Sequence, residues 1–273
     1  MVTSEMQAER YLKHLTTIME TGTKIYPRGL EVREVADLQL DVDPRYPFMT
    51  FKARKYDVNY FKKEMCWKLG ASQYDQEIMK HAKMWGIVRN PDNTFNSNYG
   101  QYWFGAQSGL WSVVTELIRD PDSRRAVIPM LNAKHLEPWV VDTVCTEAVG
   151  FRIRDGKLHC SVHMRSSDSV YGLGTDIATF SFLMFLVHAL ITPSVQESVG
   201  LGEMKITAMS SHIYSTHYKM VDQMLSDGIE EFDPVSMPKC EYDEAMYLVS
   251  KRGKGMNECN PRYALTRWLI EQS

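Results

Sequence analysis

Apolar side chains recur every three or four residues in three otherwise polar stretches of the chain, a spacing that predicts amphipathic helices. The expected helices cover residues 4–22, 57–69 and 108–119. Ser4 and Gln7 have the spacing of a capping box at the start of the first helix, and Gly70 and Asp120-Pro121 would end the other two. A nearly continuous apolar run over 180–191 predicts a buried core helix, because it is shorter than the ~20 residues of a membrane span.

Alternation of apolar and polar residues predicts strands between these helices. The clearest are 148–154 and 157–165, which flank Asp155-Gly156, a dipeptide that favours a two-residue hairpin turn. In the second arm alternate residues are apolar and would face the core: Leu158, Cys160, Val162 and Met164.

Weaker patterns predict further elements. They are extended segments over 26–43, 126–131 and 209–214, a surface loop over 89–102, a helix over 218–224, and a tail after Cys240 that is irregular until a helix begins near Tyr263. This mixed order of helices and strands favours one α+β domain over residues 1–273, built around one sheet.

Composition narrows the class of protein. The chain has 273 residues, a net charge of −3 and a pI of about 6.3. This balance supplies no positive field for nucleic acid or an anionic membrane, so neither is an expected partner. The five cysteines are odd in number and form no CxxC, which argues against a disulfide framework or a zinc site. Without a basic and apolar leader at its start, the chain is expected in a reducing, cytoplasmic compartment.

Cys145 stands immediately before the predicted hairpin. A single cysteine near a strand is in most proteins an inert buried residue, and that interpretation stays open on the spacing alone. A nucleophilic cysteine needs a cationic neighbour that stabilises its thiolate, and Arg124, Arg125 and Arg165 are the candidates in the sequence.

Several short motifs occur in a fixed order along the chain. They are Arg28, Glu64-Met-Cys-Trp67, Asn96-Ser-Asn-Tyr-Gly100, Asp120-Pro-Asp-Ser-Arg-Arg125, Cys145, the stretch from Arg165 to Asp176, and Ser211-His-Ile-Tyr214. Together they resemble the thymidylate synthase superfamily, with no clear match after Asp222. The resemblance implies a single α+β domain with a mixed sheet flanked by helices and a long buried central helix. It also implies a homodimer with shared active sites.

Asp176 separates the branches of this superfamily. Its members usually carry Asn there, whose donor and acceptor suit the O4 and N3–H of uracil. Cytosine presents the reverse pattern, and a carboxyl group that holds or shares a proton can donate to N3 and accept from N4. Within the superfamily the chain therefore resembles the phage-type deoxycytidylate (dCMP) hydroxymethylases. Val88, where thymidylate synthases usually carry a second tryptophan, fits that branch but also fits a plain core position.

The resemblance implies the catalytic roles. Cys145 would attack C6 of the pyrimidine, which makes C5 nucleophilic toward the methylene group of 5,10-methylenetetrahydrofolate. Glu64 would act as general acid/base and orient the water that completes the reaction. Apolar neighbours in its helix would desolvate Glu64 and move its pKa toward neutrality. Without the family context, Glu64 would be read as an exposed helix residue.

The resemblance also implies the binding roles. Arg165, Ser166 and Arg28 would hold the 5′-phosphate, Arg124 and Arg125 would reach the phosphate in the neighbouring subunit, and His212 and Tyr214 would bind the sugar hydroxyl. Glu64, Trp85 and Gly172 would line the folate site, and Asp168 would lie near the folate or order the site, with no metal required. The other histidines, including His14, His81 and His188, are expected to be structural or exposed.

One position departs from the family pattern, and other functions stay open. Gly150-Phe151 stands where the family has Gln followed by an aromatic residue. A hydroxymethylase acting on CMP would share the same Asp176. A thymidylate synthase or a hydroxymethylase acting on dUMP would need Asp176 to bind uracil. An inactive relative that binds nucleotide or RNA is the non-enzyme alternative. If the gene is a phage's, the compartment is the cytoplasm of the infected cell.

Overall fold

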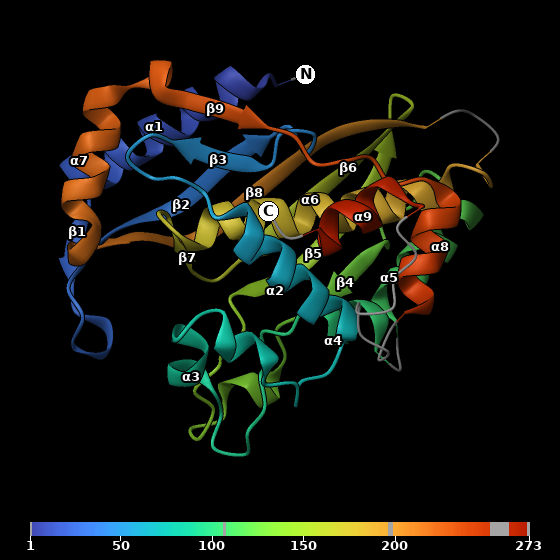
Figure 1. Cartoon of the computed structure of the whole chain (residues 1–273), viewed down its shortest axis with the longest axis horizontal. Coiled ribbons are helices and arrows are strands. Elements are labelled where there is room, and N and C mark those ends of the chain that lie inside the picture. Colours follow the sequence, from blue (N-terminus) through green and yellow to red (C-terminus); the bar gives the residue numbers. More distant parts are fainter. Residues whose placement is uncertain (1, 106–107, 196–198, 252–261, 272–273) are drawn as a thin grey trace. The chain divides into compact units, whose positions relative to one another are not determined.

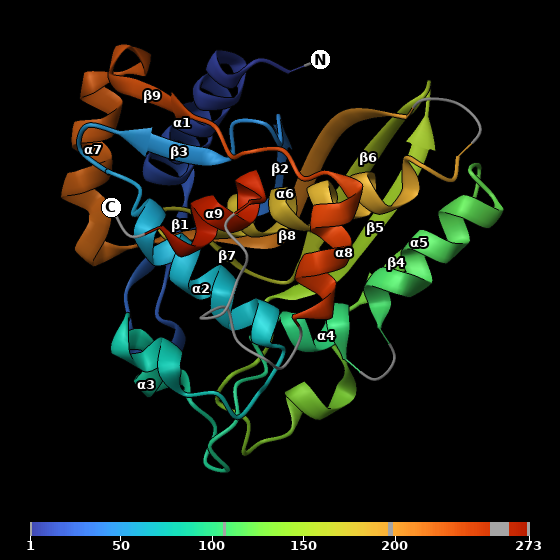
Figure 2. The ribbon, with the colours of Figure 1, turned by 45° about the vertical axis from the view of Figure 1, so that its right-hand side comes forward.

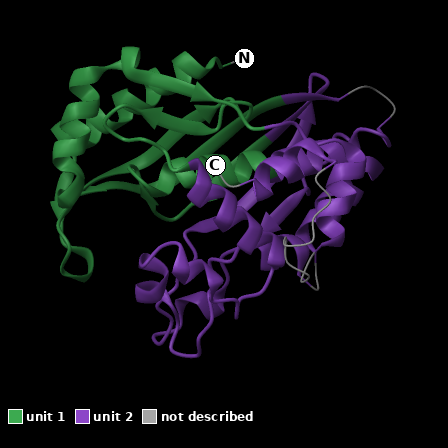
Figure 3. Cartoon of the chain, in the orientation of Figure 1, with its two compact units in different colours: residues 1–57, 160–182, 202–237 green, residues 58–159, 183–201, 238–273 purple. Residues whose placement is uncertain are grey.

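The computed structural model describes residues 2–105, 108–195, 199–251 and 262–271. These residues form two compact units, coloured separately in Figure 3. Unit 1 comprises residues 1–57, 160–182 and 202–237, and unit 2 comprises residues 58–159, 183–201 and 238–273. The expectation of one catalytic domain over residues 1–273 stays a prediction.

Unit 1 contains a mixed sheet and the helices that pack on it (Figure 1). Its elements, some of which extend into unit 2, are α1 (Ser4–Thr21), β1 (Thr23–Ile25), η1 (Pro27–Gly29), β2 (Val32–Val42), β3 (Phe48–Phe51), β6 (Lys157–Met164), β7 (Ser167–Asp168), α6 (Gly172–Ile191), β8 (Gly200–Tyr214), η4 (Ser215–His217), α7 (Tyr218–Asp227), η5 (Ile229–Glu231) and β9 (Phe232–Val235). The strand order is β1-β2-β8-β6, with β7 beside β8, and β3 pairs with β9 in a second sheet.

The long pairing of β2 with β8 is antiparallel and runs from Val32 opposite Tyr214 to Val42 opposite Met204. β7 pairs with β8 in the parallel sense, which makes the sheet mixed. β1, β3, β7 and β9 are two to four residues long. None of them was expected as a separate strand, because such short segments show no measurable alternation.

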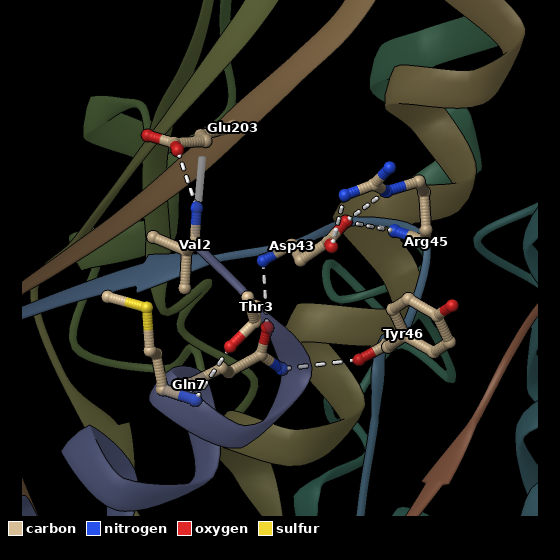
Figure 4. A network of polar contacts seen from close by, with 8 residues as sticks. Val2, Thr3, Gln7, Asp43, Arg45, Tyr46 and Glu203 are labelled. Atoms are coloured by element: carbon tan, nitrogen blue, oxygen red, sulfur yellow. Dashed lines mark hydrogen bonds and ion pairs between the residues drawn. The ribbon is translucent and has the colours of Figure 1, made fainter.

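Helix α1 lies against β2, and polar groups at its first turn connect it to the turn that follows β2 (Figure 4). The fully buried Gln7 side chain donates to the Tyr46 carbonyl at 3.2 Å and accepts from the Asp43 amide at 2.8 Å. The Thr3 hydroxyl accepts from the Met6 amide, so Thr3 is the N-cap. The expectation that Ser4 caps this helix was therefore wrong by one residue. These contacts fix α1 along the sheet, which matters for His14 further along the helix.

Unit 2 is built mainly from short helices around a two-stranded antiparallel segment (Figure 2). Its elements are α2 (Val58–Gly70), η2 (Glu77–Lys80), α3 (Met84–Val88), α4 (Gly100–Phe104), α5 (Gly109–Arg119), β4 (Val127–Pro129), η3 (Ala133–Leu136), β5 (Thr146–Arg154), α8 (Tyr242–Ser250) and α9 (Ala264–Ile270). The helices expected over 57–69 and 108–119 correspond to α2 and α5. The tail after Cys240 was expected to be irregular, but it forms α8 before α9. Cys259 lies outside the described residues.

The hairpin expectation is confirmed by the backbone at Asp155 and Gly156. Their φ angles are 51° and 66°, the left-handed pair that a two-residue type I′ turn requires. Strands β5 and β6 flank this turn, and all four apolar residues expected to face the core from β6 are buried.

The core-helix expectation is also confirmed, although α6 begins earlier than the apolar run. α6 is long and apolar enough to span a membrane by composition, but 83% of its most apolar window is buried inside the protein. The α+β class with a mixed sheet, flanking helices and a buried apolar helix is thus the observed fold.

Candidate active site

The sheet of unit 1 brings the two candidate sugar-binding residues to one strand end. β7 and β8 place Asp168 directly opposite His212, and β2 places Glu34 on the other side of His212. Tyr214 lies two residues further along β8, and its ring meets the His212 ring edge-on with centroids 5.1 Å apart. Asp168, His212 and Tyr214 therefore form one cluster.

Arg28 and Arg165, two of the candidate phosphate-binding residues, are close enough to His212 to affect its pKa. Burial is the main cause that lowers the pKa of His212, and the positive charges of Arg28 and Arg165 lower it further. The carboxylates of Asp168 and Glu34 act in the opposite direction. The net lowering keeps the imidazole neutral near pH 7, so His212 can donate one hydrogen bond and accept another.

Asp168 caps the buried helix α6. Its carboxylate accepts hydrogen bonds from the amides of Val170, Tyr171 and Gly172 at 3.0–3.4 Å. These amides are at the positive end of the helix dipole, where a carboxylate is favourable. A side chain at Gly172 would place its Cβ 3.2 Å from the Asp168 Cβ, so glycine preserves the cap. Asp168 thus orders the start of α6, and its expected place near the folate stays a prediction.

Asp176 follows one helical turn after Gly172. It is partly buried, whereas the residues of α6 that come after it, 177–187, are all buried. The Asp168 cap therefore fixes the helix start from which the Asp176 side chain extends. This placement gives the candidate base-reading carboxyl a rigid backbone.

Arg28 has a different local structure. It lies exposed in η1, between β1 and β2, with φ at 54° and ψ at 28°. Ser166 immediately precedes β7 and is partly buried. The left-handed backbone of Arg28 costs about 1–2 kcal/mol relative to an ordinary conformation.

In unit 2 the candidate acid/base residue Glu64 forms a buried ion pair. Lys68, one turn further along α2, places its Nζ 2.7 Å from Glu64 Oε1, and both side chains are almost fully buried. The Lys68 ammonium also lies 5.0 Å from the centroid of the Tyr99 ring. The desolvation expected for Glu64 is thus observed.

Tyr99 connects this pair to the segment of the candidate nucleophile. Its hydroxyl accepts a hydrogen bond from Thr146 Oγ1 at 3.2 Å, and Thr146 is the residue after Cys145. Sequence reasoning assigned no role to Lys68 or Tyr99. The spacing of Lys68 four residues after Glu64 was a usable signal for an ion pair, although helical lysines are usually exposed.

A second polar network holds the residues before Cys145. The buried Asp142 carboxylate accepts from the Ser97 amide at 2.8 Å and from the Ser97 hydroxyl at 2.5 Å. The Asn90 side-chain oxygen accepts from the amides of Val141 and Asp142, both at 2.9 Å. Sequence reasoning did not identify Asp142 as a site residue. Cys145 itself is a partly buried residue that immediately precedes β5.

Trp85 packs in an aromatic cluster with Trp67 and Phe95, at centroid distances of 5.0 and 5.8 Å. Its Nε1 donates to the Tyr60 hydroxyl at 2.8 Å, and Val88 packs against the same cluster. Trp85 is therefore part of a core, and its folate-binding role stays a prediction.

Arg124 and Arg125 are both exposed in the turn before β4. The positive charge of Arg125 contributes to a lowered pKa of Glu116, after the larger effect of a hydrogen bond from Ser123.

At Gly150, the position where the family has Gln, an added Cβ would meet only Val127 Cγ2, at an ordinary contact distance of 3.8 Å. Packing therefore does not require glycine there.

Within the described ranges, His, Cys, Asp and Glu side chains form no group of three or more that could hold a metal ion.

Comparison with known proteins finds similarity over more of the chain than these motifs cover. A sequence model of the family named thymidylate synthase matches residues 9–247 of the chain, well past Asp222, where the resemblance was expected to end. The chain is similar to the deoxycytidylate 5-hydroxymethyltransferases of Enterobacteria phages T2 and T4. Each is 26% identical over 237 residues, which are 84% of this chain and 94% of the relative.

Proposed function

Because the chain belongs to the thymidylate synthase family, we propose that it converts dCMP, 5,10-methylenetetrahydrofolate and water into 5-hydroxymethyl-dCMP and tetrahydrofolate. Enzymes of this family transfer one carbon from that folate to a pyrimidine nucleotide. The phage relatives are named for a hydroxymethyl transfer to deoxycytidylate, which supports the choice of substrate and product.

Asp176 is the observation that carries the cytosine assignment. A carboxyl that holds or shares a proton can donate to N3 of cytosine and accept from its N4 amino group. Uracil offers the reverse pattern, which an amide complements. The partial burial of Asp176 supports this role, because a mismatched hydrogen bond is costly only where water cannot replace it.

The proposed reaction begins at Cys145. Its thiolate adds to C6 of dCMP, and C5 then forms a bond to the methylene carbon of the folate. Loss of the C5 proton and departure of tetrahydrofolate leave an exocyclic methylene on the ring. Water adds to that methylene, the C5–C6 double bond returns, and the Cys145 thiolate leaves.

Glu64 moves protons and orients the water in this scheme. The buried ion pair with Lys68 supports the role, because it holds the carboxylate in one geometry away from bulk solvent. The hydrogen bond between Thr146 and Tyr99 fixes the residue next to the nucleophile. Both arrangements reduce the motion needed during catalysis.

The binding roles follow the cluster in unit 1. Arg28, Arg165 and Ser166 bind the 5′-phosphate, and the neutral His212 and Tyr214 bind the sugar hydroxyl. Trp85, Asp168 and Gly172, with Glu64, line the folate site. We infer a cytoplasmic homodimer in which the exposed Arg124 and Arg125 reach the phosphate bound by the partner subunit.

Product analysis tests the proposal. The protein is incubated with methylenetetrahydrofolate and either dCMP, CMP or dUMP, and the products are weighed by mass spectrometry. The proposal expects a gain of CH₂O on dCMP. A preferred gain of CH₂O on CMP would indicate that the substrate is the ribonucleotide. A gain of CH₂ on dUMP would indicate a thymidylate synthase, and no product with any nucleotide would favour an inactive binding protein.

A further inference from the structure

Three polar side chains, one from α1 and two beside the junction of β7 and β8, meet in unit 1. His14 Nε2 lies 2.8 Å from the Ser211 hydroxyl and 3.2 Å from the Ser169 hydroxyl. The two hydroxyl oxygens are 2.7 Å apart, so the three polar atoms form a ring in which each atom lies within hydrogen-bond distance of the other two. Both serines are fully buried. Ser169 and Ser211 lie inside two of the sequence motifs, but neither serine was assigned a role, and the proposed chemistry does not use the ring.

Each serine is next to a residue of the cluster formed by Asp168, His212 and Tyr214, which is proposed to bind the nucleotide. Ser169 follows Asp168, and Ser211 precedes His212, while Asp168 and His212 are opposite each other in the sheet. The Ser169 amide also donates to the His212 carbonyl at 2.8 Å. Because each serine is bonded through the backbone to its neighbour in the cluster, a shift of the serine backbone shifts that neighbour as well.

Strand β7 depends on side chains to keep its register. It is two residues long, so its ladder supplies few backbone hydrogen bonds. From α1, His14 holds the serine pair, and Tyr11 donates its hydroxyl proton to the Ser169 carbonyl at 2.7 Å. Helix α1 is fixed independently by Gln7. The helix therefore acts as a rigid support for a junction that is too short to be stable alone.

We propose that His14 is a positioning residue for nucleotide binding, which sets the relation of Asp168 to His212 through the hydroxyls of Ser169 and Ser211. The inference rests on the proposed function, in which this cluster binds the nucleotide. His14 does not touch the substrate. Burial lowers the pKa of His14 to about 4, so the imidazole is neutral at assay pH and one hydroxyl can donate to its Nε2.

The test compares His14→Leu with His14→Gln, whose amide can still form hydrogen bonds from a similar position. Ile18→Ala is the matched control, because Ile18 is a buried residue of the same helix that takes no part in the ring. Calorimetry measures the Kd for dCMP of each folded variant. Hydrogen exchange measures protection of the Ser169 amide.

We expect His14→Leu to raise the Kd for dCMP about tenfold, the effect of losing roughly one well-placed hydrogen bond. Faster exchange at Ser169 should accompany it, and His14→Gln should restore most of both. Ile18→Ala should lower the Tm with an unchanged Kd. Should His14→Leu fold poorly, Ser211→Ala opens the same ring with little change in volume.

An unchanged Kd and unchanged Ser169 exchange in His14→Leu and Ser211→Ala would overturn the proposal. So would an equal loss of affinity in Ile18→Ala, which would indicate general destabilisation. Failure of the wild-type protein to bind dCMP, CMP or dUMP would instead contradict the proposed function itself, while the exchange result would still report on the ring.

Discussion

Removing the positive partner of Glu64 should be among the most damaging single changes in unit 2. Lys68→Met keeps most of the side-chain volume but deletes the ammonium group 2.7 Å from the Glu64 carboxylate. Both side chains are at most 6% exposed, so water cannot take over the role of the lost partner. Breaking such a buried pair from one side typically costs about 3–5 kcal/mol.

The assay is urea unfolding of the wild type, Lys68→Met, Glu64→Gln and the double variant. Because the double variant has no buried charge at this site, it should be more stable than Lys68→Met alone. Lys68→Arg, the control that keeps the charge, should lose less stability than Lys68→Met. Turnover of Lys68→Met should fall in kcat more than it rises in KM for dCMP, because Glu64 acts in the chemical steps.

The reasoning fails if Lys68→Met loses less than about 1 kcal/mol, the range of an exposed pair. It also fails if the effects of the two single substitutions simply add in the double variant, since a direct ion pair must show coupling.

Three further predictions address the nucleophile, the dimer and His14. Cys145→Ser should abolish turnover and tritium release from C5-labelled dCMP, with Cys160→Ala affecting stability at most; undiminished release would remove Cys145 from the mechanism. Mixing Arg125→Ala with Cys145→Ala protein should restore part of the activity through hybrid dimers, and no recovery after proven subunit exchange would contradict a shared site. His14 has a folded pKa of about 4, below its unfolded value of 6.5, so its contribution to stability is complete above pH 6.5 and is lost as pH falls from 6.5 toward 4. The loss should reach at most about 3 kcal/mol. As pH falls across this range, the denaturant midpoint should decrease less steeply in His14→Gln than in the wild type. Equal slopes in the two proteins would refute the assignment of this pH dependence to His14.

Features governed by neighbouring residues were predictable from the sequence. The turn at Asp155-Gly156 follows from local conformational preference, and the burial of Leu158 follows from alternation along one strand. The core helix was recognised from its apolar run. Its start at Gly172 was not, because Asp168 caps it from a two-residue strand that has no sequence pattern of its own.

The motifs identified the candidate site residues but not the contacts that support them. A helical lysine such as Lys68 would be expected at the surface, and its contacts with the buried Glu64 carboxylate and the Tyr99 ring explain its burial. Likewise, the partners of His14 lie 155 and 197 residues away in the sequence. Long-range pairs of this kind depend on the sheet register, which composition and spacing do not specify.

The claim at the centre of this account is that Asp176 reads a cytosine base, and Asp176→Asn tests it most directly. An amide complements uracil and mismatches N3 of cytosine, at a cost of about 1–3 kcal/mol. The measurement is the ratio of kcat/KM for dCMP to that for dUMP, in wild type and variant. The ratio should fall by at least about tenfold in Asp176→Asn, with hydroxymethylated rather than methylated products. An unchanged preference for dCMP in a folded, active variant would contradict the claim.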